Sequence, residues 1–201
     1  MNRQENDGAY AADPKDLDLT YHEMRAAIDA ETDIAEPVFV PSIHPLYILY
    51  TSGTTGDPKG VVRDHGGTAV ALNYALDNNF NMQPGTNYFS AADIGWIVGH
   101  TIIVYGPLIR GSNTMIYEGK PILPDAGILW KICDKYKIEG IFVAPTTVRE
   151  LKRVDSEGTK ILEHDISSLE HLSLAGERCD PDTILWLRKN LPNVCINDNW
   201  W

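Results

Sequence analysis

Residues 50–60 most constrain this chain, because an ordinary turn does not need three glycines, four serine or threonine hydroxyls and a lysine together. Glycines let backbone N–H groups approach an oxyanion closely, hydroxyls add hydrogen-bond donors, and Lys59 brings a mobile positive charge. The segment is therefore predicted to bind phosphate groups. The alternative is a flexible surface loop without a ligand. The predicted phosphate-binding residues are Thr51, Ser52, Gly53, Thr54, Thr55, Gly56 and Lys59.

The segment is not a Walker phosphate loop. That pattern places a serine or threonine directly after its lysine, whereas Gly60 and Val61 follow Lys59. The run before the segment, residues 47–50, is apolar and short enough for a buried strand. We therefore expect the loop to leave the end of a strand in a parallel sheet, where α/β proteins bind their ligands.

The charge of the chain is concentrated in its first part. The formal net charge is −11, from 17 basic and 28 acidic residues, and residues 1–36 supply −7 of it with ten acids against three bases. The remaining residues are close to neutral, so the acidity says little about the phosphate segment. An acidic chain also argues against nucleic acid as a partner, because nucleic acid favours a basic face.

Cysteines and apolar runs indicate an intracellular chain outside the membrane. The three cysteines are widely spaced, without a CxxC pair, which is typical of reduced thiols rather than of disulfides or a zinc site. The longest uncharged stretch, residues 94–109, is too short and too polar to span a bilayer. The first residues match neither a secretory signal nor a transit peptide. We expect the cytoplasm or, in a eukaryote, the mitochondrial matrix.

Strand-like and helix-like patterns alternate along the chain. They predict an α/β fold with a mostly parallel, wound sheet and flanking helices. Residues 1–44 are predicted to be an acidic leader with a short helix and a linker, and residues 45–201 part of a larger domain, because the chain stops in a loop after a strand. The predicted helices are 20–30, 68–80, 125–136 and two that start at Pro145 and at Asp180-Pro181; the predicted strands are 46–51, 87–91, 114–117, 141–144, 171–175 and 194–196.

Four polar or glycine-rich segments follow predicted strands: residues 51–60, 93–100, 175–178 and 198–201. The carboxyl ends of parallel strands meet at one edge of a sheet. These four segments are therefore predicted to converge on one crevice.

The phosphate segment closely resembles the signature loop of the acyl-adenylate-forming enzymes. Further motifs narrow the resemblance to the short-chain acyl-CoA synthetases, the acetyl- and propionyl-CoA synthetase group, over roughly residues 45–201. These motifs are Asp93–His100 followed by Tyr105–Leu108, Tyr117–Pro121, Ala144–Thr146, Ala175–Arg178 and Asp198–Trp201.

The resemblance implies a ligase that uses ATP, Mg²⁺ and coenzyme A. A carboxylate attacks the α-phosphate of ATP to give acyl-AMP, and the thiol of coenzyme A then takes the acyl group. Thr51 and Lys59 are the implied catalytic residues, since such chemistry depends on positioning and charge stabilisation. The implied adenine and AMP residues are Gly176, Glu177 and Arg178 along one face of the base, Trp200 stacked on the other, Asp198 at the adenine amino group and Asn199 at the α-phosphate. Asn199 stands where the family usually has threonine, and Arg178 where many acetate enzymes have proline.

The resemblance also implies an acyl pocket built from Ile97, Val98, Ala175 and Trp201. A tryptophan across the tunnel leaves no room for a long alkyl tail. Acetate enzymes typically carry valine at the position of Ala175, so the smaller side chain favours propionate, with acetate as a slower substrate. One buried methylene discriminates only about 10–200-fold.

Several alternatives stay open. The protein could adenylate another carboxylate, as peptide-synthetase domains do, or be a truncated, non-catalytic chain that binds a nucleotide. Trp200 and Trp201 could be core aromatics and Glu177 a surface acid. The resemblance places the Mg²⁺-binding acid and the adenylating lysine beyond residue 201, so no metal ligand is assigned here and we expect the 201 residues alone to turn over little or not at all. The sequence does not predict an oligomeric state.

Overall fold

The computed structural model describes residues 21–31, 35–51 and 56–200, which divide between two compact units, residues 1–40 and 41–201. The described part of the first unit contains helix α1 (Tyr21–Ala30), close to the predicted helix. Arg25 Nε lies 3.1 Å from a carboxylate oxygen of Asp29, one helical turn later. The second unit carries every predicted site residue and is described below.

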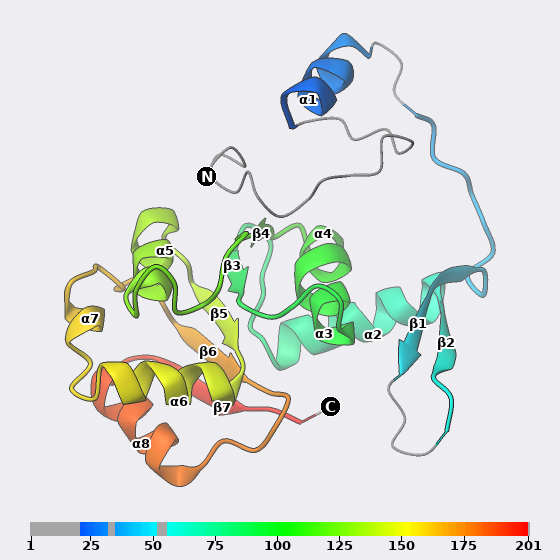
Figure 1. Cartoon of the computed structure of the whole chain (residues 1–201). Coiled ribbons are helices and arrows are strands. Elements are labelled where there is room, and N and C mark those ends of the chain that lie inside the picture. Colours follow the sequence, from blue (N-terminus) through cyan, green and yellow to red (C-terminus); the bar gives the residue numbers. More distant parts are fainter. Residues whose placement is uncertain (1–20, 32–34, 52–55, 201) are drawn as a thin grey trace. The chain divides into compact units, whose positions relative to one another are not determined.

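A five-stranded parallel sheet forms the centre of the second unit (Figure 1). All four strand pairs are parallel, with the order β4-β3-β5-β6-β7. The predicted α/β fold with a mostly parallel sheet is thereby confirmed. The strands are β3 (Asn87–Ser90), β4 (Asn113–Met115), β5 (Gly140–Val143), β6 (His171–Leu174) and β7 (Cys195–Asp198).

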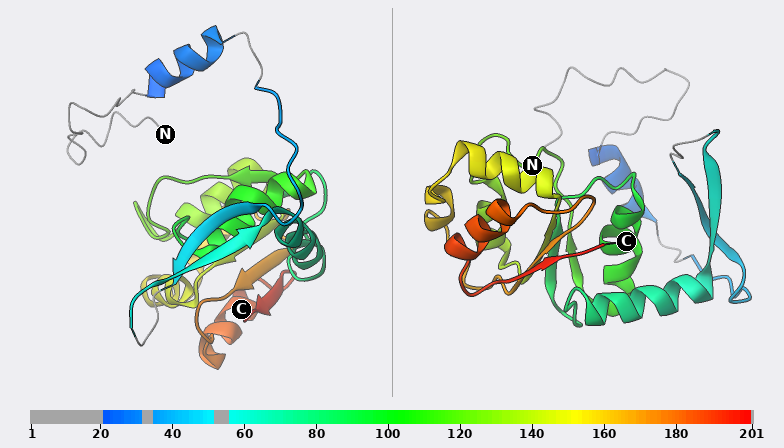
Figure 2. Two further views of the ribbon diagram at one scale, coloured as in Figure 1. Left: turned by 90° about the vertical axis from the view of Figure 1, so that its right-hand side faces the viewer. Right: turned by 90° about the horizontal axis from the view of Figure 1, so that it is seen from below.

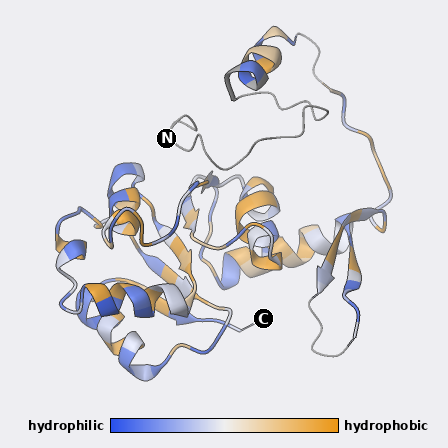
Figure 3. Ribbon diagram, viewed as in Figure 1, coloured by the Kyte–Doolittle hydropathy of each residue, from blue (hydrophilic) through white to orange (hydrophobic). Residues whose placement is uncertain are grey.

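Helices cover both faces of this sheet because its strands are apolar on both sides. Phe89 and Ile141 belong to a buried cluster with α5, α6 and α8, whereas Tyr88 and Phe142 belong to a second cluster with α2 and α3. The ribbon of the central strand β5 has the hydrophobic colour in Figure 3. The helices are α2 (His65–Asn78), α3 (Ile97–Gly99), the π-helical turn η2 (His100–Tyr105), α4 (Gly106–Arg110), α5 (Ile128–Tyr136), α6 (Pro145–Val154), α7 (Thr159–Leu162) and α8 (Pro181–Asn190).

The predicted strand at 46–51 forms, but the prediction that it is a buried strand of the parallel sheet is wrong. Strand β1 (Pro45–Thr51) pairs antiparallel with β2 (Lys59–Asp64) in a separate two-stranded sheet, which Figure 2 shows from two directions. Ile48 is 58% exposed. The physical reason is that a short apolar run fits a hairpin as well as a buried strand, and the β-branched Val61-Val62 after the loop provides the returning partner.

The helix after the hairpin begins three residues earlier than predicted. Asp64 is its N-cap, and its Oδ1 accepts a hydrogen bond from the N–H of Gly67 at 2.6 Å. The glycine turn Gly66-Gly67-Thr68 before the predicted start is already helical. A carboxylate satisfies a free N–H at a helix start better than a glycine turn does, which explains the difference.

Most of the apolar segment 94–109 is helical, from Ile97 onward. It folds into α3, η2 and the first part of α4, and Ile102 and Ile103 are buried. In the described part of the chain, no helix combines the length and the apolar character needed to cross a membrane.

Candidate nucleotide site

Two of the predicted segments meet at the carboxyl ends of β6 and β7. Together they line a cavity of about 380 Å³. The two strands are neighbours in the sheet, with Leu174 opposite Asp198, so the segments that follow them leave the sheet side by side (Figure 1). The residues around the cavity are Gly176, Glu177, Arg178, Asp198, Asn199 and Trp200. They are the six residues predicted for adenine and AMP.

Two hydrogen bonds join the two segments. The N–H of Asn199 donates to the carbonyl of Leu174 at 2.7 Å, and the N–H of Cys179 donates to Asp198 Oδ2 at 3.3 Å. Gly176 has a φ of +109°, a conformation that glycine adopts without a steric penalty. The turn after β6 therefore needs this glycine to bring Glu177 and Arg178 to the wall of the cavity.

Asn199 presents an unsatisfied donor. Its Nδ2 atom is buried and has no hydrogen-bond partner among the described residues. A buried polar group without a partner is costly, so such groups in folded proteins call for an explanation. Asn199 also lines the cavity, so this amide is the candidate donor for a ligand oxygen.

Trp200 and Asp198 offer complementary contacts for a flat, polar ring. Trp200 is 96% exposed, so its indole face is available to a ligand. Asp198 uses Oδ2 for the N–H of Cys179, and its other carboxylate oxygen can accept a further hydrogen bond. An aromatic face beside an acceptor can bind a purine that carries an amino group.

An ion-pair network lies behind the wall of the cavity. Arg149 on α6 donates to Glu177 Oε1 and lies 3.4 Å from Asp180 Oδ2. Asp180 is the N-cap of α8 and accepts from the N–H and the hydroxyl of Thr183, each at 2.9 Å. The hydrogen bond from the Thr183 backbone is the main cause that lowers the pKa of Asp180. Sequence reasoning did not identify Arg149, because no pattern within α6 marks it.

The predicted phosphate segment lies in the β1–β2 hairpin, not after a strand of the main sheet. Thr51 Oγ1 is 3.5 Å from the carbonyl oxygen of Lys59, and Gly56 has a φ of +99°. Residues 52–55, which include Ser52, Gly53, Thr54 and Thr55, lie outside the described residues. No described hairpin residue lines the cavity at 176–200. The prediction that this segment follows a strand of the parallel sheet is wrong, whereas its convergence with the other three segments stays a prediction.

The hairpin does contact the segment after β3. The Tyr47 ring on β1 stacks on Tyr105 with 5.4 Å between ring centroids and lies 5.1 Å from the His100 ring. His100 belongs to the predicted segment 93–100, and its Nδ1 is 3.1 Å from the carbonyl oxygen of Trp96. This contact attaches the phosphate segment's hairpin to the helices that follow β3.

The predicted acyl-pocket residues are partly brought together. Val98 and Ala175 are 8% and 2% exposed and belong to the same buried cluster, although one follows β3 and the other β6. Ile97, the first residue of α3, is half-buried. Trp201 lies outside the described residues. Val98 and Ala175 are thus in one cluster, and Ala175 directly precedes Gly176 in the wall of the candidate cavity.

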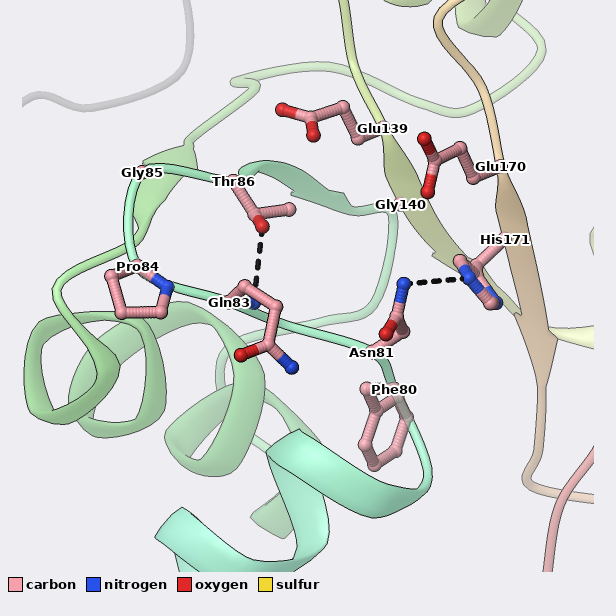
Figure 4. Close-up of a pocket in the computed structure, with 10 residues that line it drawn as sticks. All are labelled: Phe80, Asn81, Gln83, Pro84, Gly85, Thr86, Glu139, Gly140, Glu170 and His171. Carbon is pink, nitrogen blue, oxygen red and sulfur yellow. Dashed lines mark hydrogen bonds between the residues drawn. The ribbon is translucent and has the colours of Figure 1, made fainter.

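A second cavity of about 380 Å³ lies at the opposite edge of the sheet, where β3, β5 and β6 begin (Figure 4). Asn81 Nδ2 is 2.8 Å from His171 Nε2, and the Gln83 N–H donates to Thr86 Oγ1 at 3.0 Å. The two cavities have the same volume, so position distinguishes them. Parallel sheets bind ligands at the carboxyl ends of their strands, which favours the cavity beside Trp200.

Comparison with known proteins identifies the family of this chain. The family described as AMP-binding enzyme matches residues 4–201. The chain is 51% identical over 162 residues to the mitochondrial acyl-CoA synthetase short-chain family member B of Dictyostelium discoideum, covering 81% of this chain and 24% of that protein. It is 51% identical over 154 residues to a propionate–CoA ligase of Salmonella typhimurium, covering 77% of this chain and 24% of the ligase.

A solved structure supports the fold. The acetoacetyl-CoA synthetase of Streptomyces lividans superposes with a TM-score of 0.73 at 28% identity, covering 82% of this chain and 26% of that one. This chain therefore spans about a quarter of the length of the relatives it matches. The resemblance stated from the motifs is confirmed, and the chain belongs to the AMP-binding enzyme family.

Proposed function

We propose that this chain supplies the adenine-nucleotide site of an acid–thiol ligase that activates a short-chain carboxylate with ATP, propionate in preference to acetate. The acid becomes acyl-AMP and then acyl-CoA. The observation that carries the proposal is the cavity at the ends of β6 and β7, because its six lining residues are those predicted for AMP.

The cavity suits AMP in three respects. The exposed indole of Trp200 can stack on one face of adenine, and the second carboxylate oxygen of Asp198 can accept from the adenine amino group. The unpartnered Nδ2 of Asn199 can donate to an α-phosphate oxygen. Each contact uses a group whose hydrogen-bonding or stacking capacity the fold leaves unused.

The other site residues keep the roles that the resemblance implies. Thr51 and Lys59 would stabilise the charge on the phosphates, with the hydroxyls and glycines of residues 52–56 as additional donors. The described residues contain no cluster of three acidic, histidine or cysteine side chains that could hold a metal ion.

The small side chain of Ala175 supports the preference for propionate. The resemblance implies that Ala175 lines the acyl pocket, where a larger residue would take up space needed by the acyl chain. In the structure Ala175 is buried in one cluster with Val98. A buried methylene contributes about 0.8 kcal/mol, which fits a modest preference over acetate. Within this proposal the 201 residues alone turn over little or not at all, so the test measures binding rather than turnover.

An alkyl-ester series tests the proposal. Calorimetric titration of the chain with AMP, ethyl-AMP, propyl-AMP and octyl-AMP should give the highest affinity for propyl-AMP, with ethyl-AMP about three- to ten-fold weaker. Octyl-AMP should bind no better than AMP. The variant Ala175→Val should reverse the order of propyl-AMP and ethyl-AMP. Tightest binding of octyl-AMP, or of an aminoacyl-adenylate analogue, would instead favour a different adenylating enzyme.

A further inference from the structure

Arg149 does not line the candidate cavity, but it contacts Glu177, which does. Glu177 lies in the exposed turn between β6 and α8, next to Gly176 with its positive φ. Turns of this kind contain few packed side chains and sample several conformations unless they are anchored. Among the described residues, Arg149 provides the hydrogen bond and ion pair to the Glu177 side chain.

Arg149 joins three elements through one guanidinium. From α6 it donates through one nitrogen to Glu177 and through another to Asp180. Asp180 is the N-cap of α8, so the start of that helix and the turn before it share one anchor. A planar guanidinium with two donors directed at two carboxylates fixes their relative position better than a single point charge does.

The network also reaches the other side of the cavity. Cys179, between Glu177 and Asp180, donates its N–H to Asp198 Oδ2. Displacing the turn would therefore disturb Asp198 as well as Glu177. The positive charge of Arg149 also offsets the negative charge that Glu177 would otherwise present to a nucleotide's phosphates.

We propose that Arg149 is a positioning residue of the nucleotide site, which holds Glu177 and thereby fixes the turn 176–178 in the conformation that binds adenine nucleotide. This inference rests on the proposed function. Arg149 is not among the cavity-lining residues, so it acts through Glu177. The side chains of Arg149 and Glu177 are 36% and 42% exposed, and ion pairs of such exposure contribute little to overall stability. Their effect should be seen in binding.

The test compares two arginines of the same helix. Arg153 pairs with Glu150 on α6 through hydrogen bonds of 2.8 and 2.6 Å and does not contact the turn. Arg149→Gln should weaken AMP binding about three- to ten-fold, the range expected when a binding loop loses its preorganisation, and should speed hydrogen exchange in the peptide 175–180. Arg153→Gln should change neither quantity. Both variants should keep the thermal midpoint of the parent chain within a few degrees.

Two further variants separate positioning from a merely structural role. Arg149→Lys should restore part of the affinity, because one ammonium can reach one of the two carboxylates. Glu177→Gln alone should also weaken AMP binding, and the loss of binding free energy in the double variant Arg149→Gln/Glu177→Gln should be smaller than the sum of the two single losses. This non-additivity marks a direct interaction.

The failures of the two proposals can be told apart. Parent-like AMP affinity and parent-like exchange of the turn in Arg149→Gln, or equal losses in Arg149→Gln and Arg153→Gln, would overturn the positioning role. A parent chain that does not bind AMP would contradict the proposed function. The hydrogen exchange of the turn, measured without nucleotide, would then still decide whether Arg149 holds it.

Discussion

Replacing Trp200 with alanine should weaken AMP binding about ten- to a hundred-fold and leave the free energy of unfolding almost unchanged. Stacking of a base on an aromatic side chain contributes about 1–3 kcal/mol, and 1.4 kcal/mol corresponds to a tenfold change in affinity. Trp200 is 96% exposed, so its removal costs little packing. The measurement is calorimetric titration with AMP, paired with urea unfolding of the same sample.

Two control variants sharpen this test. Trp200→Phe keeps an aromatic face and should retain most of the affinity. Tyr74 is an aromatic residue of α2 that is 69% exposed and does not line the cavity, so Tyr74→Ala should bind AMP like the parent chain. Parent-like affinity in Trp200→Ala would show that the indole does not stack on the base.

Replacing Phe89 with alanine should destabilise the chain by about 3–5 kcal/mol. Phe89 is fully buried in β3, which pairs with β4 on one side and β5 on the other. Its ring also makes an edge-to-face contact with Tyr117 at 6.4 Å between centroids. The expected loss is a large fraction of the about 5–15 kcal/mol that stabilises a typical domain, and urea unfolding followed by circular dichroism measures it.

A phenylalanine outside the core provides the matched control. Phe39 is 96% exposed, and Phe39→Ala should change the free energy of unfolding by less than about 0.5 kcal/mol. A loss of unfolding free energy below about 1 kcal/mol in Phe89→Ala would contradict a packed sheet in the isolated chain. It would also remove the basis for placing the segments after β6 and β7 side by side.

The main sheet could be predicted from the sequence because local signals and packing agree there. Ile141–Ala144 is apolar enough to be buried on both faces, and the Asp180-Pro181 pair provides both an N-cap and a favourable first helical residue. The structure has β5 and the start of α8 at these places. The carboxyl ends of parallel strands lie at one edge of a sheet, which predicts that the segments after β6 and β7 meet, and they do.

The hairpin and the ion-pair network could not be predicted in the same way. Residues 45–51 carry the same apolar pattern whether they pair with β2 or lie inside a parallel sheet, so the choice depends on partners distant from the local pattern. The position of Arg149 beside Glu177 depends on how α6 packs near the start of α8. Tertiary packing of that kind leaves no periodic signal in the sequence.

The most direct test of the central claim is a crystal structure of this chain with AMP. We predict that the adenine ring lies against Trp200 and the turn 176–178, with its amino group on Asp198 and the phosphate within hydrogen-bond distance of Asn199 Nδ2. Adenine bound instead in the cavity beside His171, at the opposite edge of the sheet, would contradict the account.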